Sequence, residues 1–128
     1  MDSPLLVTSA IIINNDKILL IKRGREPFKG KWSLIGGCGA FKHNLDPVEA
    51  VKIEVKIDIN CEFQPTFFDY NFSEFELPTV TMFFHGTIAG EIQPSPKHVQ
   101  EYKWFNFSEI SSPELAFDHN EILDKFIK

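Results

Sequence analysis

The sequence predicts an α/β fold, an α/β/α sandwich in which a central mixed β-sheet lies between helices. Runs of β-branched or alternating apolar residues recur along the chain, and two other segments carry apolar residues at helical spacing. Each of these elements has an apolar face that must be buried against a partner layer. The 128 residues fit one domain, residues 1–128, which is long enough to bury a core without metal or disulfide cross-links.

The N-terminal third predicts a hairpin, a loop and a short strand. Residues 5–13 are rich in β-branched side chains, residues 14–16 have turn chemistry, and an apolar run returns over 18–21. Glycine and proline among the charged residues of 23–31 indicate an exposed loop. The apolar segment 32–35 then predicts another strand.

A helix is predicted over 47–59. Asp46 is suited to the N-cap and Pro47 to the first helical position, where a missing N–H costs nothing. Val48, Val51 and Val55 recur at helical spacing behind them.

The C-terminal half predicts three more strands and a last helix. The strands are expected over 62–70, 79–88 and 102–107, and Asp118 is expected to cap the helix. Strict alternation over 79–88 predicts one core face and one mostly polar face.

Charge and composition exclude some classes of function. The formal net charge of −5 argues against a protein that holds duplex nucleic acid by neutralising its phosphates. The apolar run 4–13 is too short to span a bilayer, and the N-terminus lacks signal-peptide features, so we expect a cytoplasmic protein without a membrane partner. Cys38 and Cys61 are then expected to be free thiols.

The residues from Gly36 to Asp58 carry the candidate chemistry. Gly36 and Gly37 precede the predicted helix, and Glu54 and Asp58 lie four residues apart on it. They therefore project from one helix face, as two carboxylates that share a hard cation would. A solvated surface is the ordinary interpretation of such a pair alone, but its position after a Gly-Gly loop favours a ligand site.

This region resembles the Nudix hydrolase family, whose box ends in Arg-Glu-apolar-any-Glu-Glu-any-Gly-apolar. Glu54 matches the first of these glutamates, and Asp58 is a shortened version of the last. Ile53 replaces the Arg, Ile57 replaces a metal-binding Glu, and Asn60 replaces the Gly. The surrounding segments GKWSLIGG, EYKWF and LAFDHNEIL are similar to those of the family, so the resemblance covers nearly the whole chain.

The loop before the helix also departs from the family. It is two residues longer than the family spacing. The earlier Glu of the box therefore falls on His43 when residues are counted forward from Gly37, and on Leu45 when they are counted back from the helix. Neither residue is a carboxylate. A further family Glu falls on Lys97, and Glu101 matches a recurring acidic position that could be a base or a strand-surface carboxylate.

The resemblance implies a Nudix-like fold and a hydrolase that cleaves a diphosphate linkage in a nucleoside diphosphate derivative, either ADP-ribose-like or a sugar nucleotide. It implies Mg²⁺ or Mn²⁺ held by Glu54, Asp58 and the carbonyl of Gly36, with both carboxylates catalytic and Gly37 binding substrate. The segment AFDH, residues 116–119, favours the ADP-ribose-like branch of the family. Homodimers are common in the family, so a second copy of the chain is an expected partner.

Two further groups of residues are candidates for substrate contacts. Arg23 lies in a basic cluster beside the Gly-rich loop and is our candidate for a phosphate contact, although a solvated loop explains most such clusters. Several aromatic residues could stack on a nucleobase or form core. They are Phe67, Phe68, Tyr70, Phe72 and Phe75.

The departures from the family leave other functions open. The losses at Ile53, Ile57 and Lys97 and the longer loop also fit a non-catalytic Nudix-like module that binds a nucleotide. A protein-interaction domain that uses a Phe-rich surface is a third hypothesis, which rests on composition alone.

Overall fold

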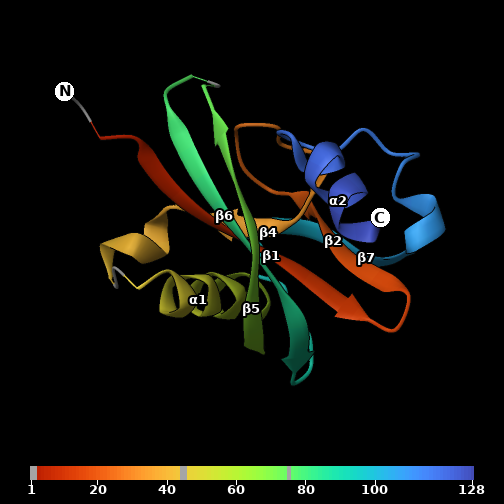
Figure 1. Cartoon of the computed structure of the whole chain (residues 1–128). Coiled ribbons are helices and arrows are strands. Elements are labelled where there is room, and N and C mark those ends of the chain that lie inside the picture. Colours follow the sequence, from red (N-terminus) through yellow and green to blue (C-terminus); the bar gives the residue numbers. More distant parts are fainter. Residues whose placement is uncertain (1–2, 44–45, 75) are drawn as a thin grey trace.

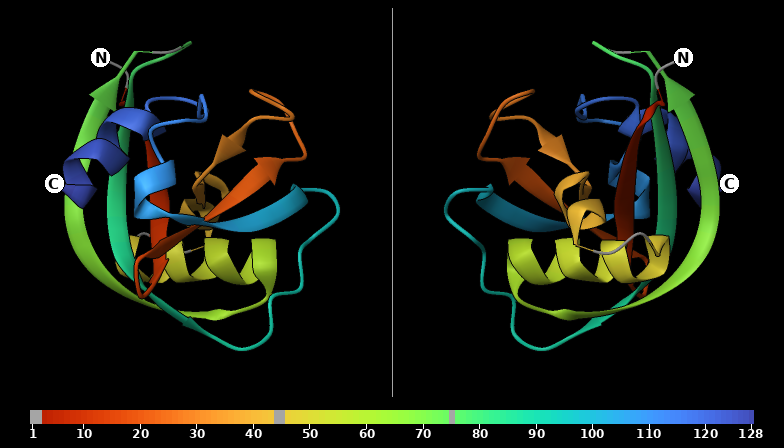
Figure 2. Two further views of the ribbon diagram at one scale, coloured as in Figure 1. Left: turned by 90° about the vertical axis from the view of Figure 1, so that its right-hand side faces the viewer. Right: turned by 90° about the vertical axis from the view of Figure 1, so that its left-hand side faces the viewer.

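The computed structural model describes residues 3–43, 46–74 and 76–128, and it has a mixed sheet between two helices (Figure 1). Helices α1 and α2 cover opposite sides of the strands, as the two side views show (Figure 2). The predicted α/β sandwich is therefore confirmed. The elements are β1 (Leu5–Asn14), β2 (Lys17–Arg23), β3 (Trp32–Ser33), β4 (Ile35–Gly37), η1 (Gly39–Lys42), α1 (Pro47–Ile59), β5 (Glu62–Ser73), β6 (Thr79–Ala89), β7 (Val99–Asn106), η2 (Phe107–Glu109) and α2 (His119–Ile127).

Strand β1 is the centre of the sheet. It pairs in parallel with β6 and antiparallel with β2 and β4, while β5 pairs with the far side of β6 and β7 with β2. Alternate β1 residues point to opposite faces, so Ile12 packs in the same core as Val55 of α1, and Ile11 packs with Leu123 of α2. Each helix thus closes one of two hydrophobic cores.

Two details of the strands differ from the prediction. Segment 32–35 is two strands, because Ser33 pairs with Ile21 of β2 whereas Ile35 pairs with Ala10 of β1. The predicted polar face of 79–88 is wrong at Phe83, which is fully buried in the core that α2 closes. Both faces of β6 are covered there, and alternation alone does not reveal the second layer.

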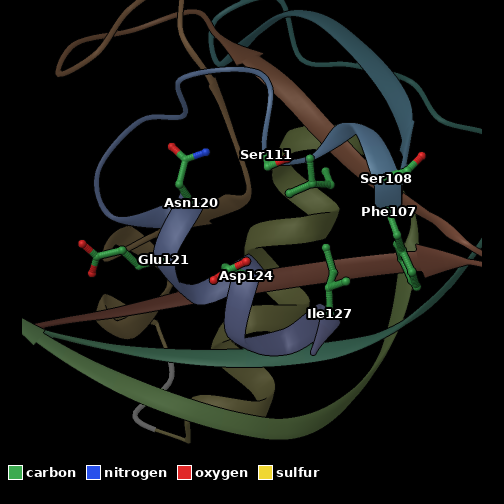
Figure 3. Close-up of a pocket in the computed structure, with 8 residues that line it drawn as sticks. Phe107, Ser108, Ser111, Asn120, Glu121, Asp124 and Ile127 are labelled. Carbon is green, nitrogen blue, oxygen red and sulfur yellow. The ribbon is translucent and has the colours of Figure 1, made fainter.

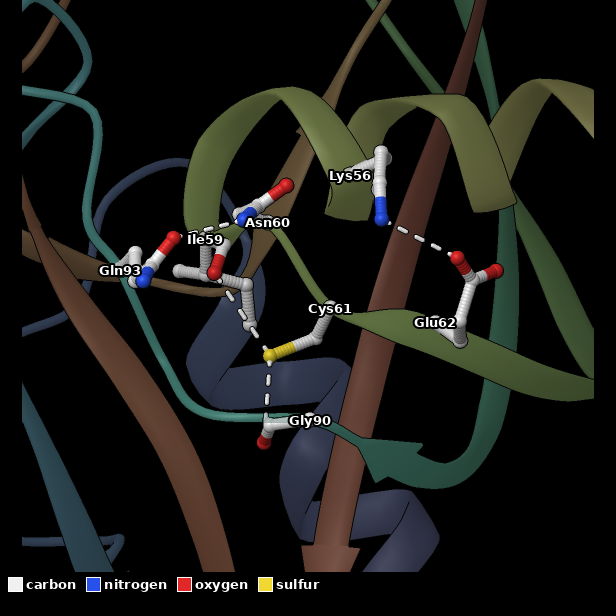
Figure 4. Close-up of polar contacts among 7 residues, drawn as sticks. All are labelled: Lys56, Ile59, Asn60, Cys61, Glu62, Gly90 and Gln93. Atoms are coloured by element: carbon white, nitrogen blue, oxygen red, sulfur yellow. Dashed lines mark hydrogen bonds and ion pairs between the residues drawn. The ribbon is translucent and has the colours of Figure 1, made fainter.

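The end of helix α1 explains one departure from the family pattern. Asn60, which replaces the family glycine, is the C-cap, with a left-handed φ of 59° and its N–H bonded to the carbonyl of Lys56. Asn tolerates this region better than other non-glycine residues. Its Nδ2 donates to Oε1 of Gln93 at 2.7 Å, and Lys56 pairs with Glu62 beside it (Figure 4).

Cys38 and Cys61 are free thiols, as expected. The Cys61 sulfur lies 3.6 Å from the carbonyl oxygen of Ile59 and 3.7 Å from that of Gly90 (Figure 4). In the part of the chain that the structure describes, no helix combines the length and the apolar character needed to cross a membrane.

Candidate active site

Helix α1 presents Glu54 and Asp58 from one face, as their spacing predicts. Both side chains are buried, with exposed fractions of 3% and 2%. Ala50, Val51, Val55 and Ile59 are buried on the same helix. The two carboxylates therefore lie within the protein and are not a solvated surface pair.

Strand β4, called the glycine strand below because it ends in Gly36 and Gly37, holds Glu54 together with the turn after it. The N–H of Ala40 donates to Glu54 Oε1 at 2.9 Å. A Cβ on Gly37 would lie 3.1 Å from Oε1 and 3.2 Å from Oε2 of the same side chain, so the carboxylate rests directly against the Gly37 backbone. A Cβ on Gly36 would lie 2.5 Å from the Thr8 carbonyl oxygen, so strand β1 can approach only a glycine there.

Asp58 lacks the compensation that a buried carboxylate needs. Its Oδ1 is buried and has no hydrogen-bond partner among the described residues. The pKa of Asp58 is raised to about 7, first by burial and then by the nearby charge of Glu54, while Arg25 and Arg23 act in the opposite direction. An unpartnered carboxylate oxygen next to a second carboxylate is a position that a cation would stabilise.

A cleft of about 460 Å³ lies beside the glycine strand. Its wall includes residues from β1, the loop after β2, the glycine strand, the β5–β6 turn and the start of α2. Its cationic lining residues are Arg23, Arg25 and Lys42, and its acidic ones are Glu26, Glu76 and Asp118. Glu54 and Asp58 do not line the cleft; the backbone from Gly36 to Gly39 lies between it and Glu54.

The structure distinguishes the two arginines of the cleft. Arg23 is 9% exposed, its Nε donates to the carbonyl of Pro27 at 2.7 Å, and its guanidinium lies 5.0 Å from the ring centroid of Phe117. Burial and the charge of Arg25 lower the Arg23 pKa. Arg25 is exposed and close enough to Asp58 to affect its pKa. Arg25 is therefore the freer cation for a ligand anion, while Arg23 is partly committed to the protein.

Sequence reasoning missed two histidines near the cleft and the carboxylates. His119 is buried, and its Nδ1 accepts a hydrogen bond from the N–H of Leu34 at 3.1 Å. Burial, together with the charge of Arg23, lowers the pKa of His119 to about 3, so the ring is neutral. His98 has a buried Nδ1 without a partner among the described residues, and burial and Arg25 lower its pKa while Glu54 raises it. His98 carries no sequence signal, whereas His119 belongs to the AFDH segment of the family resemblance.

Several candidates lie away from this site. Ile57, at the position of a family Glu, is 47% exposed. Glu101 is an exposed residue on β7 whose Oε2 lies 4.0 Å from Lys22 Nζ, so its surroundings are those of a strand-surface carboxylate. His43 is exposed at the end of η1, and Leu45 falls outside the described residues. The aromatic candidates Phe67, Phe68, Tyr70 and Phe72 do not line the cleft, and Phe75 falls outside the described residues.

The carboxylates fit one divalent ion better than a larger metal cluster. Among residues 3–43, 46–74 and 76–128, no three His, Cys, Asp or Glu side chains are placed to hold a metal together. Mg²⁺, however, is usually bound by only one or two carboxylates together with substrate phosphates. The unpartnered Asp58 oxygen and the adjacent Glu54 carboxylate supply such a pair.

A second hollow of about 510 Å³ lies between η2 and α2 (Figure 3). Its charged lining residues are Glu121 and Asp124, and it has no Lys or Arg in its wall. Negative charge without a cation disfavours phosphate groups, so the smaller cleft is the better candidate for an anionic ligand.

Comparison with known proteins agrees with the geometry. A family model described as the NUDIX domain matches residues 4–126. The chain is 25% identical to the ADP-ribose pyrophosphatase of Methanocaldococcus jannaschii, over 98% of this chain and 74% of that protein. The crystal structure of a MutT NUDIX hydrolase from Burkholderia pseudomallei matches with a TM-score of 0.82 and 25% identity, over 96% of this chain and 98% of that one. The NUDIX domain of Shewanella oneidensis NrtR, solved with ADP ribose, matches with a TM-score of 0.79 and 20% identity, over 98% of this chain and 88% of that one.

Proposed function

This chain belongs to the Nudix hydrolase family, and we propose that it is a pyrophosphohydrolase that cleaves the diphosphate linkage of a nucleoside diphosphate derivative with Mg²⁺ or Mn²⁺. ADP-ribose is the first substrate to test, because the relative from Methanocaldococcus jannaschii is an ADP-ribose pyrophosphatase and the NrtR domain was solved with ADP ribose. Sugar nucleotides are the other substrate class.

The single observation that carries the proposal is the buried carboxylate pair beside a cationic cleft. Two negative charges buried together at Glu54 and Asp58, with one Asp58 oxygen unpartnered, are unfavourable, and a bound cation would offset them. Their position behind the glycine strand, which lines the cleft, supports a cation site beside a bound diphosphate.

Glu54 and Asp58 would hold the ion, with the carbonyl of Gly36 as the expected backbone ligand. Bound there, a divalent ion supplies neutralisation of diphosphate oxygens and lowers the pKa of a bound water. Ala40 fixes the Glu54 carboxylate through its N–H, which keeps one oxygen oriented. Arg25 and Lys42, both in the cleft wall, are suited to bind the phosphate oxygens, and Gly37 lets the substrate approach the backbone.

Hydrolysis by wild type and Glu54→Gln tests the proposal. The glutamine retains an oxygen that can accept from Ala40 N–H, so the loop should stay in place while the charge is lost. We expect Mg²⁺-dependent release of AMP from ADP-ribose by wild type and a loss of roughly a hundredfold or more in kcat for the variant, since electrostatic stabilisation is a large part of such catalysis.

Glu49→Gln is the matched control. Glu49 lies on the same helix, is exposed and pairs with Lys52 at 3.6 Å, so its change should leave hydrolysis within about twofold of wild type. Equal activity of wild type and Glu54→Gln on ADP-ribose and on a panel of sugar nucleotides would refute the mechanism.

A non-catalytic nucleotide-binding module is the second candidate function. The exposed Ile57 and the absence of a third metal-binding side chain near the pair, among the described residues, favour it. Nucleotide binding without turnover of any diphosphate in the panel would support this alternative. Metal-dependent turnover above about 0.1 per second, against a typical ~10 per second for enzymes, would exclude it.

A further inference from the structure

Thr8 is a buried polar residue that no family motif or sequence pattern assigned to a role. It lies on the central strand β1, it is 0% exposed, and its Oγ1 has no hydrogen-bond partner among the described residues. A buried hydroxyl without a partner costs free energy, so such groups are rare unless water or a ligand supplies the contact. Packing of the core therefore does not account for this hydroxyl.

Strand geometry places the Thr8 side chain on the face of the sheet that carries the two carboxylates. Ala10 and Ile12 pack in the core that α1 closes, and alternation along β1 puts Thr8 on the same face. Thr8 pairs with Gly37, and paired residues have Cβ atoms about 5 Å apart. Because a Gly37 Cβ would lie 3.1 Å from Glu54 Oε1, the Thr8 Cβ is at most about 8 Å from that oxygen.

The buried side-chain atoms without a partner gather around the same carboxylates. Among the residues that the structure describes, these atoms are Thr8 Oγ1, Asp58 Oδ1 and His98 Nδ1. The carbonyl of Asp58 accepts the N–H of Ser95, three residues before His98, and the charge of Glu54 acts on the His98 ring. Thr8 therefore approaches the carboxylates from β1, and His98 approaches them from the loop before β7. Unpaired groups that converge from different elements indicate a shared partner from outside the chain.

A hydrated divalent ion matches this arrangement. Mg²⁺ prefers octahedral geometry and gives up water reluctantly, so it usually keeps several water ligands. No three His, Cys, Asp or Glu side chains of the described part of the chain are placed to hold a metal together, so water ligands are needed to complete the octahedron. A hydroxyl can both donate to and accept from a water, so Thr8 suits a water ligand better than the metal itself.

We propose that Thr8 is a positioning residue for the divalent ion, and that its hydroxyl hydrogen-bonds a water ligand of an ion held by Glu54 and Asp58. The inference rests on the proposed function for the ion, and it adds a residue of β1, outside the Nudix box, to the support of that ion. Groups in this outer position orient the ligands of a metal, and their loss typically weakens metal binding by about ten- to a hundredfold.

Calorimetric titration of Mn²⁺ alone into wild type, Thr8→Val and Thr8→Ser tests this role. Valine keeps the shape of threonine and removes the hydroxyl, so we expect the Mn²⁺ affinity of Thr8→Val to fall about tenfold. Serine keeps the hydroxyl and loses only the methyl group, so Thr8→Ser should bind Mn²⁺ within about threefold of wild type.

Urea unfolding separates this role from a role in packing. In EDTA, Thr8→Val should unfold at the same urea concentration as wild type or at a higher one, because the substitution removes a buried hydroxyl without a protein partner. At one fixed Mn²⁺ concentration, the midpoint of wild type should rise more than that of Thr8→Val, because the ion stabilises the protein that binds it more tightly.

Thr87→Val is the matched control, because Thr87 is exposed on β6 and pairs with Gln64 of β5. It should bind Mn²⁺ as wild type does. Equal Mn²⁺ affinities of Thr8→Val and wild type, an equal loss in Thr8→Ser, or a lower urea midpoint for metal-free Thr8→Val would each overturn the inference and leave the hydrolase proposal intact. Absence of Mn²⁺ binding by wild type would overturn both. Thr8-dependent Mn²⁺ binding by a protein that hydrolyses nothing would keep the inference and refute the hydrolase proposal.

Discussion

Individual residues show both what the sequence could predict about the site and what it could not. The four-residue spacing of Glu54 and Asp58 correctly placed them on one helix face, since helical geometry is local. Their burial depends on β4 and η1, which pack over that face through Gly37 and Ala40. Burial therefore had to come from the structure, and it is burial that turns a charged pair into a candidate metal site.

The arginines and Phe117 illustrate the same limit. Arg23 and Arg25 are equivalent in sequence, and only tertiary contacts commit Arg23 to Pro27 and Phe117 while leaving Arg25 exposed. Phe117 has no periodic neighbours that would separate it from core aromatics. Its position in the cleft wall depends on a backbone turn that brings it beside a loop about ninety residues earlier.

His119 makes a prediction about pH. Its folded-state pKa of about 3 lies below the usual 6.5, because the ring is buried and the positive charge of Arg23 is nearby. The unfolded chain therefore binds a proton first as the pH falls, so the stability that neutral His119 provides is complete above pH 6.5 and is lost toward pH 3. Between pH 7 and 5 the free energy of unfolding should fall by about 2 kcal/mol from this group.

Urea unfolding of wild type, His119→Asn and His43→Asn at pH 7 and pH 5 measures this contribution. The asparagine at 119 can still accept a hydrogen bond but does not titrate, so that variant should lose about 2 kcal/mol less than wild type over the same interval. His43 is exposed, and its variant should follow wild type. Identical pH dependence in all three proteins would contradict the buried neutral ring.

At the scale of elements, local signals predicted boundaries and tertiary pairing changed them. Helix α1 begins and ends where the sequence predicted, because the Asp46 carboxylate accepts the N–H of Val48 and Pro47 suits the first turn. Segment 32–35 became two strands because its halves pair with different neighbours. A single sequence contains no direct signal for which strand will be that neighbour.

The end of α1 gives a prediction for Asn60. Its φ of 59° is costly for alanine and costless for glycine, so Asn60→Ala should lower the free energy of unfolding by about 1 kcal/mol more than Asn60→Gly. Both variants lose the bond to Gln93, which makes each the control for the other. Chemical denaturation that gives equal stabilities would show that the left-handed cap is not what the position requires.

The glycine strand gives a second prediction at this scale. A methyl group at Gly37 would lie 3.1 Å from Glu54 Oε1, whereas one at Gly39 would lie 3.8 Å away, an ordinary contact. Gly37→Ala should therefore displace the carboxylate and weaken Mn²⁺ binding roughly tenfold or more, a loss typical of disturbed groups that support a metal site. Gly39→Ala should bind as wild type does, and equal Mn²⁺ affinities for the two variants, measured by calorimetry, would count against Glu54 as a ligand.

For the molecule as a whole, the order of elements was enough to predict the fold. Strands with alternating apolar residues and two helices with apolar faces can be buried together only in layers, and the structure has those layers around two cores. The cleft could not be predicted in this way, because its wall combines segments from both ends of the chain. The homodimer and the cytoplasmic location remain predictions.

The central claim is that the buried carboxylates of α1 form a divalent-metal site next to a nucleotide cleft. Calorimetric titration of Mg²⁺ and Mn²⁺ into wild type and Glu54→Gln, with ADP-ribose present to supply phosphate oxygens, tests it most directly. The account predicts binding of about one ion per chain to wild type and loss of that binding in the variant. Absence of metal binding to either protein, or equal binding to both, would contradict it.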